Sequence, residues 1–433
     1  MTEEQFHEAM LRGQGRCILA AKANPDRYRS EVLWACSHEI AYDPQCEGTR
    51  SWLLSSLIDC YEDKNSFVNA LTESLELSRS NGGWEILYLA EVLRNLSNDG
   101  DNMAKVALWR KYEKLYERLS MITERPEGIF FECEDFSMLC QVLGETKEGM
   151  IRIAEDIGRL YCEKKTVDAR DFDWLFDTHG EQFRRTLIWY AKKSENIDAF
   201  IRRGLDNIQT RNKCMKDPNR KRTGIALSSW LKHKADQKTV LQYAEEYLKQ
   251  SDPEARADAL KAFLLCPFPG DPTPIITDAL SDCSNLSDVA WRALENICHP
   301  QVREFAACHL IDYFDAALPV FITNYQPGDD DQLFKLITAV PVDFECTTAW
   351  HSFHHDVLRM QDQGNKAPAQ VLRYIYENTY CSFCREHTLH QMAKRRLLED
   401  SDLEECLFDS YDDTRAYARR LLNRRKRYAI RTK

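Results

Sequence analysis

The sequence predicts an all-α protein, and three features lead to that fold class. Apolar residues recur at helical spacing, as in 302–313, where Val302, Phe305, Ala306 and Leu310 share one helix face. Gly and Pro are scarce, at 16 and 14 of 433 residues, which leaves few positions for the tight turns of a sheet. No period-two run of β-branched residues is long enough to predict a strand.

Short polar breaks divide the chain into segments of about 10–20 residues, the usual length of globular helices. The breaks are rich in Asn, Asp, Gly and Pro and lie at 24–26, 43–44, 81–83, 98–100, 217–219, 251–253, 267–274 and 327–328. Between them, 240–248 and 414–422 carry apolar stripes like that of 302–313. We therefore expect helices along the whole chain.

Three segments align without gaps, at 252–259, 299–306 and 411–418. Each has an Arg after a short polar turn, an Ala three residues later and an apolar residue seven after the Arg. The aligned residues are Arg256, Arg303 and Arg415, then Ala259, Ala306 and Ala418, then Phe263, Leu310 and Leu422. The first two copies start 47 residues apart, which matches the about 40–47 residues of a two-helix repeat.

With these segments the chain resembles the HEAT-repeat family. The resemblance implies a right-handed α-solenoid of stacked antiparallel helix pairs, an armadillo-type fold, in which stacking buries the apolar face of each pair. The resemblance is clearest over 250–425, and we predict that 251–433 forms HEAT-like repeats that end in a basic helix and tail. Residues 1–250 contain helical pairs that we expect to continue the solenoid. The family pattern also implies structural roles for Arg256 and Arg303 in the turns.

Charge is unevenly distributed. The chain has a formal net charge of −11, yet residues 415–433 hold nine basic residues and no acidic one, so residues 1–414 carry −20. A smaller basic cluster lies at 211–222. Such runs are usually solvated, but they also suit contact with phosphates or an acidic partner. The candidate binding residues are Arg211, Lys213, Arg220, Lys221, Arg222, Arg419, Arg420, Arg424 and Arg425.

Cysteine and histidine gather at 381–390, where Cys381, Cys384, His387 and His390 follow at steps of three. Side chains three apart on a helix are rotated by about 60°, so four ligands on one straight helix cannot converge on a metal. We therefore assign no metal site and keep Cys381, Cys384 and His387 as weak candidates. A site would need both cysteines in a turn and an outside partner such as His351, His354 or His355. The histidines at 351–355 lack the Glu of the H-E-x-x-H motif, so we expect partly buried helix residues there.

The sequence favours a non-catalytic protein without a cofactor. Carboxylates cluster at 132–135, 168–173 and 329–331, but the sequence does not show two carboxyls held across a substrate. The glycine-rich phosphate-binding loops, the G-x-S-x-G elbow and the EF-hand loop are missing.

Two functions are favoured, and a metal-dependent or other enzyme stays open as a third. The first is a scaffold or adaptor that binds another protein on a solenoid surface, which needs no catalytic group. The second is a nucleic-acid-binding protein with an architecture like that of HEAT-like DNA-repair glycosylases, which would use the basic clusters at 211–222 and 415–433. We expect no membrane association and a cytoplasmic location. The reasons are a start without a secretory signal, the lack of a long apolar segment, and 16 cysteines that we interpret as reduced thiols.

Overall fold

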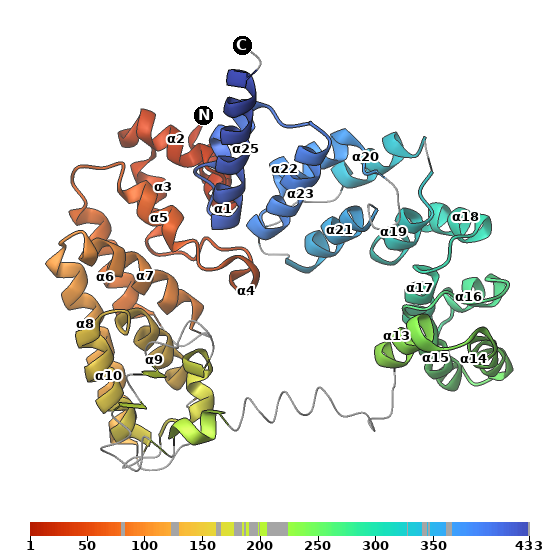
Figure 1. The fold of residues 1–433 in the computed structure, drawn as a ribbon, viewed down its shortest axis with the longest axis horizontal. Helices are drawn as coiled ribbons and strands as arrows, with labels where there is room; N and C mark the ends of the chain where they lie inside the picture. The colour runs from red at the N-terminus through yellow and green to blue at the C-terminus, as the bar shows by residue number, and fades with distance from the viewer. Residues whose placement is uncertain are drawn as a thin grey trace. The chain divides into compact units, whose positions relative to one another are not determined.

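The computed structural model is helical, and none of its described residues lies in a strand (Figure 1). The all-α prediction is confirmed to that extent. Described residues are 1–78, 83–122, 130–161, 166–176, 184–185, 188–189, 198, 200–205, 224–326, 328–339, 344, 347–360 and 366–431. Within these ranges, no helix is both long and apolar enough to cross a membrane.

The chain forms two compact units. The first contains residues 1–218 and 399–433 with the short segment 380–383, and the second contains 219–379 and 384–398. The repeat pattern grouped 399–433 with 251–398, whereas in the structure these residues pack with the N-terminal helices. The helices of the first unit are α1 (Glu3–Leu11), α2 (Arg16–Ala23), η1 (Pro25–Tyr28), α3 (Arg29–Ala35), α4 (Pro44–Glu47), α5 (Ser51–Ile58), α6 (Asn65–Leu77), α7 (Trp84–Asn98), α8 (Asn102–Met121), α9 (Phe130–Leu143), α10 (Lys147–Arg159), η3 (Ala169–Phe176), α24 (Asp400–Cys406) and α25 (Asp412–Arg431).

The second unit contains the remaining helices. They are α13 (Ile225–Lys234), α14 (Gln237–Lys249), α15 (Pro253–Leu260), η4 (Lys261–Phe263), α16 (Thr273–Asp278), α17 (Ser284–Leu294), α18 (Pro300–His309), α19 (Phe314–Thr323), α20 (Asp330–Ala339), α21 (Thr347–Arg359), α22 (Ala369–Asn378) and α23 (Ser382–Lys394). The first two residues of α23 belong to the segment 380–383.

Polar breaks in the sequence begin several helices by capping them. Asp252 accepts a hydrogen bond from the backbone N–H of Ala255, and Pro253 occupies the first helical position of α15. Asp101 and Asp236 cap α8 and α14 in the same way. These carboxylates satisfy backbone donors that a helix start leaves unpaired, which explains why the helices begin there.

Within each unit, several helices contact the next helix or the one after it. In the second unit α15 contacts α17, α17 contacts α19 and α19 contacts α21, while α16 contacts α18 and α20 contacts α22. In the first unit α3, α5, α7 and α9 form a similar series, and α6 contacts α8. Alternate helices therefore form rows that share a core, which includes the fully buried Val302 and Ala306 of α18.

The two ends of the chain meet inside the first unit. Gly13, between α1 and α2, accepts a hydrogen bond from the backbone N–H of Ser410, just before α25. Gly13 has φ +65°, and a Cβ there would lie 2.2 Å from the Ser410 hydroxyl oxygen. A Cβ at Gly15 would lie 2.2 Å from the backbone oxygen of Glu405. Glycine at both positions permits this close approach.

Candidate functional site

The basic C-terminal segment forms α25, which confirms the basic helix predicted at the end of the chain and runs from Asp412 to Arg431. Asp412 and Asp413 lie in the first turn, where negative charge suits the helix dipole. The face of α25 that packs on the first unit includes Thr414 and Ala418, which are both fully buried. This helix also packs against α24. The start of the helix is therefore fixed in the first unit.

Arg415 anchors this helix start. Its guanidinium lies 3.6 Å from the centroid of the Trp52 ring on α5. Its Nη1 donates hydrogen bonds of 2.7 Å to the backbone oxygens of Asp409 and Ser410. Burial lowers the pKa of Arg415 below its ordinary value. The Arg415 guanidinium therefore makes its contacts within the first unit, although Arg415 is one of the nine basic residues of 415–433.

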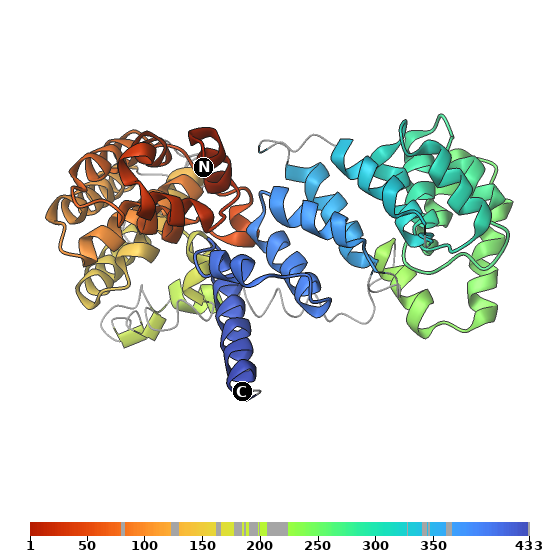
Figure 2. The ribbon, with the colours of Figure 1, turned by 90° about the horizontal axis from the view of Figure 1, so that it is seen from above.

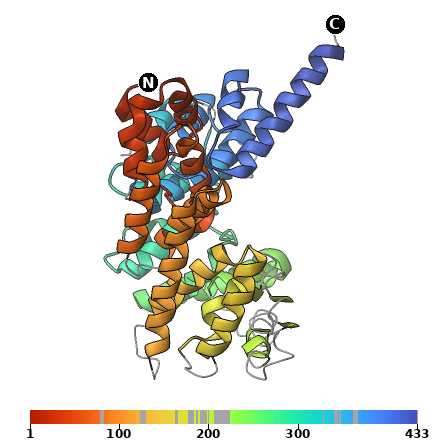
Figure 3. The same cartoon turned by 90° about the vertical axis from the view of Figure 1, so that its left-hand side faces the viewer.

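The remaining candidate arginines of α25 are exposed. Arg419, Arg420 and Arg424 have exposed side chains, as does Arg425, which forms an ion pair with Asp400 of α24. No acidic residue follows Asp413 in the helix. The two views of Figure 2 and Figure 3 show the C-terminal part of α25 extending beyond the other helices of the first unit. The helix therefore presents a concentrated positive surface.

The repulsion within this surface favours contact with an anion. Arg420 and Arg424 are four residues apart on the same helix, a spacing at which like charges destabilise the helix by a few tenths of a kcal/mol. Asn423, between the two arginines, and Lys426, after them, are also exposed. A negatively charged partner would neutralise the surface and remove this repulsion.

The second basic cluster falls outside the described residues. The range 206–223 that contains it is not described. The candidates that lie there are Arg211, Lys213, Arg220, Lys221 and Arg222. Their proposed role in binding stays a prediction from sequence.

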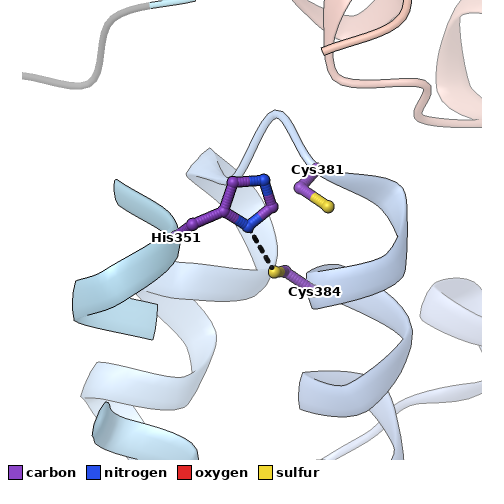
Figure 4. Close-up of side chains that lie close together, drawn as sticks. All are labelled: His351, Cys381 and Cys384. Carbon is purple, nitrogen blue, oxygen red and sulfur yellow. Dashed lines mark hydrogen bonds between the residues drawn. The ribbon is translucent and has the colours of Figure 1, made fainter. Parts of the chain in front are cut away.

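The structure gathers part of the cysteine and histidine cluster (Figure 4). Nδ1 of His351 on α21 lies 3.2 Å from Sγ of Cys384 in the first turn of α23. Cys381 directly precedes α23, and the donor atoms of His351, Cys381 and Cys384 all lie within 4.8 Å of one another. His351 is an outside partner of the kind that the sequence required, but the cysteines are not both in a turn, because Cys384 lies within α23.

The other histidines take different positions. His387 lies beside Glu386, with 3.5 Å between Nδ1 and Oε2, and is not part of the group around Cys384. His354 is buried, and its Nε2 is 2.7 Å from the hydroxyl oxygen of Thr388. Burial lowers the pKa of His354 to about 3. His355 has an exposed side chain.

Two of the carboxylate clusters share a small cavity in the first unit. Glu134 and Asp171 line it together with Arg170 and Trp174, and its volume is about 190 Å³. Burial, and then the charge of Asp171, raise the pKa of Glu134. Ligand pockets usually measure about 300–1,000 Å³, so this cavity is small for a substrate site. The backbone N–H of Asp168 also donates to Asp171, which gives that carboxylate a structural role.

The repeated arginines form matching ion pairs in the second unit. Arg256 of α15 lies 2.6 Å from a carboxylate oxygen of Asp278, and Arg303 of α18 lies 2.6 Å from one of Asp329. Both aspartates are buried. These contacts agree with the expected structural roles of Arg256 and Arg303, although both arginines lie within helices and not in turns.

Comparison with known proteins gives the chain no relative. It matches no family model, no curated protein and no solved structure.

Two residues that contact α25, Trp52 and Asp400, were not identified from the sequence. Local sequence patterns do not indicate contacts between residues so far apart along the chain.

Proposed function

We propose that the chain is a non-catalytic, HEAT-like scaffold that binds an acidic segment of a partner protein through the exposed arginines of α25. The observation that carries the proposal is the position of Arg419, Arg420 and Arg424. They are exposed on a helix without acidic residues after Asp413, and the start of that helix is anchored by Arg415. A charged surface on a rigid element suits recognition of an oppositely charged partner.

The packing supports the HEAT-like part of the proposal. Alternate helices form rows in each unit, as the stacked pairs of a solenoid would require. Arg256 and Arg303, which are 47 residues apart, pair with the buried Asp278 and Asp329, which are 51 residues apart. A recurring Arg that pairs with a buried acid is compatible with stacked repeats.

An acidic protein segment fits this surface better than a nucleic acid. Residues 419–427 of α25 span about 12 Å at 1.5 Å per residue, a short track for a duplex. Residues 1–414 carry −20, which repels a long polyanion from the rest of the molecule, whereas a short acidic peptide need approach only α25.

The test compares two probes on the full chain by fluorescence anisotropy, an acidic poly-glutamate peptide and a DNA duplex. Arg419→Gln, Arg420→Gln and Arg424→Gln are combined in one variant. The control variant combines Lys105→Gln, Lys114→Gln and Arg118→Gln, which removes the same charge from exposed positions of α8. At about 0.2–1 kcal/mol for each of the three exposed pairs, the α25 variant should bind the peptide roughly 3- to 150-fold more weakly, and the α8 variant should bind it unchanged.

Three outcomes contradict the proposal. Equal loss in both variants would mean that only net charge matters, and no peptide binding by the wild type would reject the α25 surface. Tight DNA binding that falls steeply with salt would favour the nucleic-acid function instead. In that case the α25 variant should flatten the slope of log affinity against log salt by about 0.9 for each phosphate contact removed.

A further inference from the structure

Three metal-ligand side chains meet where α21 packs against α23. Cys381 and Cys384 are buried, His351 is half-buried, and their donor atoms all lie within 4.8 Å of one another (Figure 4). The sequence alone assigned no metal to this part of the chain. The proposed scaffold function involves none of these side chains, so it does not explain why they lie together.

The positions of these donors are held by the surrounding structure. His354, one helical turn from His351 on α21, is buried with Nε2 2.7 Å from the Thr388 hydroxyl oxygen on α23. Thr388 is itself fully buried and donates to the backbone oxygen of Cys384. These contacts fix the position of α21 relative to α23 near His351 and Cys384. Cys381 is three residues before Cys384, so the backbone at the start of α23 sets the spacing of the two thiols.

We propose that His351, Cys381 and Cys384 bind a zinc ion. Each cysteine would lose its proton and supply a thiolate, and neutral His351 would supply the Nδ1 lone pair while its proton resides on Nε2. Two thiolates and an imidazole are ligands that Zn²⁺ prefers, whereas Mg²⁺ and Ca²⁺ prefer oxygen. Three protein ligands leave the fourth tetrahedral position to water or another small donor.

The observed spacing is close to what zinc requires. With Zn–S near 2.3 Å and Zn–N near 2.0 Å, tetrahedral geometry separates sulfur from nitrogen by about 3.5 Å and sulfur from sulfur by about 3.8 Å. The Nδ1 of His351 and the Sγ of Cys384 are 3.2 Å apart, so small side-chain rotations would admit the ion. Bound zinc would connect α21 to α23 and stabilise their packing.

Metal content and spectroscopy of the full chain, purified under reducing conditions, test the proposal. We expect one Zn²⁺ per chain by mass spectrometry of the metal. Replacement by Co²⁺ should give a thiolate-to-cobalt charge-transfer band, which needs no variant and therefore does not depend on the folding of one. Binding should release protons and should tighten as pH rises, because each thiol must lose its proton to bind the ion.

Matched variants test which side chains bind the ion. Cys381→Ser, Cys384→Ser and His351→Gln should each weaken zinc affinity by about 100-fold or more. The controls are Cys266→Ser, which removes another buried thiol of the second unit, and His387→Gln, three residues beyond Cys384 on α23. Both controls should bind zinc like the wild type.

Several results would overturn the site. They are a wild-type chain that retains no zinc and gives no cobalt–thiolate band, or controls that lose as much affinity as the site variants. A disulfide between Cys381 and Cys384 that persists under the reducing conditions of purification would also overturn it, because the thiolates would then be unavailable.

Discussion

Arg415 and Trp52 are in direct contact, with the guanidinium carbon 3.6 Å from the centroid of the indole ring. The two residues belong to α25 and α5, which are separated by most of the chain but lie in the same unit. An arginine over a tryptophan face is attracted by the negative charge of the ring face. This contact connects the basic helix to the N-terminal helices.

We expect a measurable coupling between these two side chains. In a double-mutant cycle with Trp52→Leu and Arg415→Gln, the interaction energy in urea unfolding should be about 0.5–2 kcal/mol. Tyr417 and Arg420 of α25 provide the control cycle. The guanidinium carbon of Arg420 lies 5.7 Å from the centroid of the Tyr417 ring, and Arg420 is exposed. Their coupling should be smaller. A Trp52–Arg415 coupling near zero would contradict the anchoring of α25.

A buried ion pair joins three stretches of the first unit. Arg50 pairs with Glu47 at 2.7 Å, and both side chains are almost fully buried. Arg50 also donates to the backbone oxygens of Ile40 and Tyr380, and Glu47 accepts from the backbone N–H of Ser382. The pair therefore satisfies backbone groups that would otherwise be buried without partners.

Removal of one partner should be costly. Arg50→Met leaves the Glu47 carboxylate buried without its cation, and such a change typically costs about 3–5 kcal/mol of unfolding free energy. Lys64→Met is the control, because Lys64 pairs with Asp59 in an exposed position and should lose at most about 1 kcal/mol. Chemical denaturation of both variants measures the difference. Equal losses would mean that the Arg50 network contributes little.

The local structure could be predicted because it depends on neighbouring residues. The apolar stripe of 302–313 became α18 as far as His309, with Val302 and Ala306 buried in the helix and Leu310 buried directly after it, and the break at Asp252 became a helix cap. The contact between Gly13 and Ser410 could not be predicted in this way. The spacing of neighbouring residues does not indicate which turns, far apart in the sequence, lie next to each other in the fold.

The cysteine and histidine cluster shows the same limit. Helix geometry correctly excluded convergence along one helix, and the need for an outside histidine followed from it. The choice of His351 over His354 and His355 depends on how α21 is rotated against α23. That rotation results from packing of the whole helix pair, such as the burial of Phe353, so a single sequence does not determine it.

Two neighbouring alanines test the packing of α18. Ala306 is fully buried, whereas Ala307 is half-buried. Ala306→Trp must displace core side chains and should lower the unfolding free energy by about 1–3 kcal/mol or more, and Ala307→Trp should lower it less. Thermal melts followed by circular dichroism compare the two variants. The same melting temperature for both would contradict the register of this helix.

Asp356 should make stability depend on pH. This residue of α21 is buried, and burial raises its pKa to about 7, although Arg359 acts in the opposite direction. An unfolded Asp titrates near 3.9, so between about pH 4 and pH 7 the folded state binds more protons than the unfolded state. The contribution of protonated Asp356 to the free energy of unfolding is therefore fully present below about pH 4 and is lost as pH rises through 7.

The variant Asp356→Asn keeps a neutral side chain at every pH. The free energy of unfolding of this variant, relative to wild type, should therefore improve by about 2–3 kcal/mol from pH 5 to pH 8. Urea unfolding at both pH values measures this change, and the exposed Asp258→Asn serves as the control. Parallel stability curves for wild type and Asp356→Asn would show that Asp356 titrates normally in the fold.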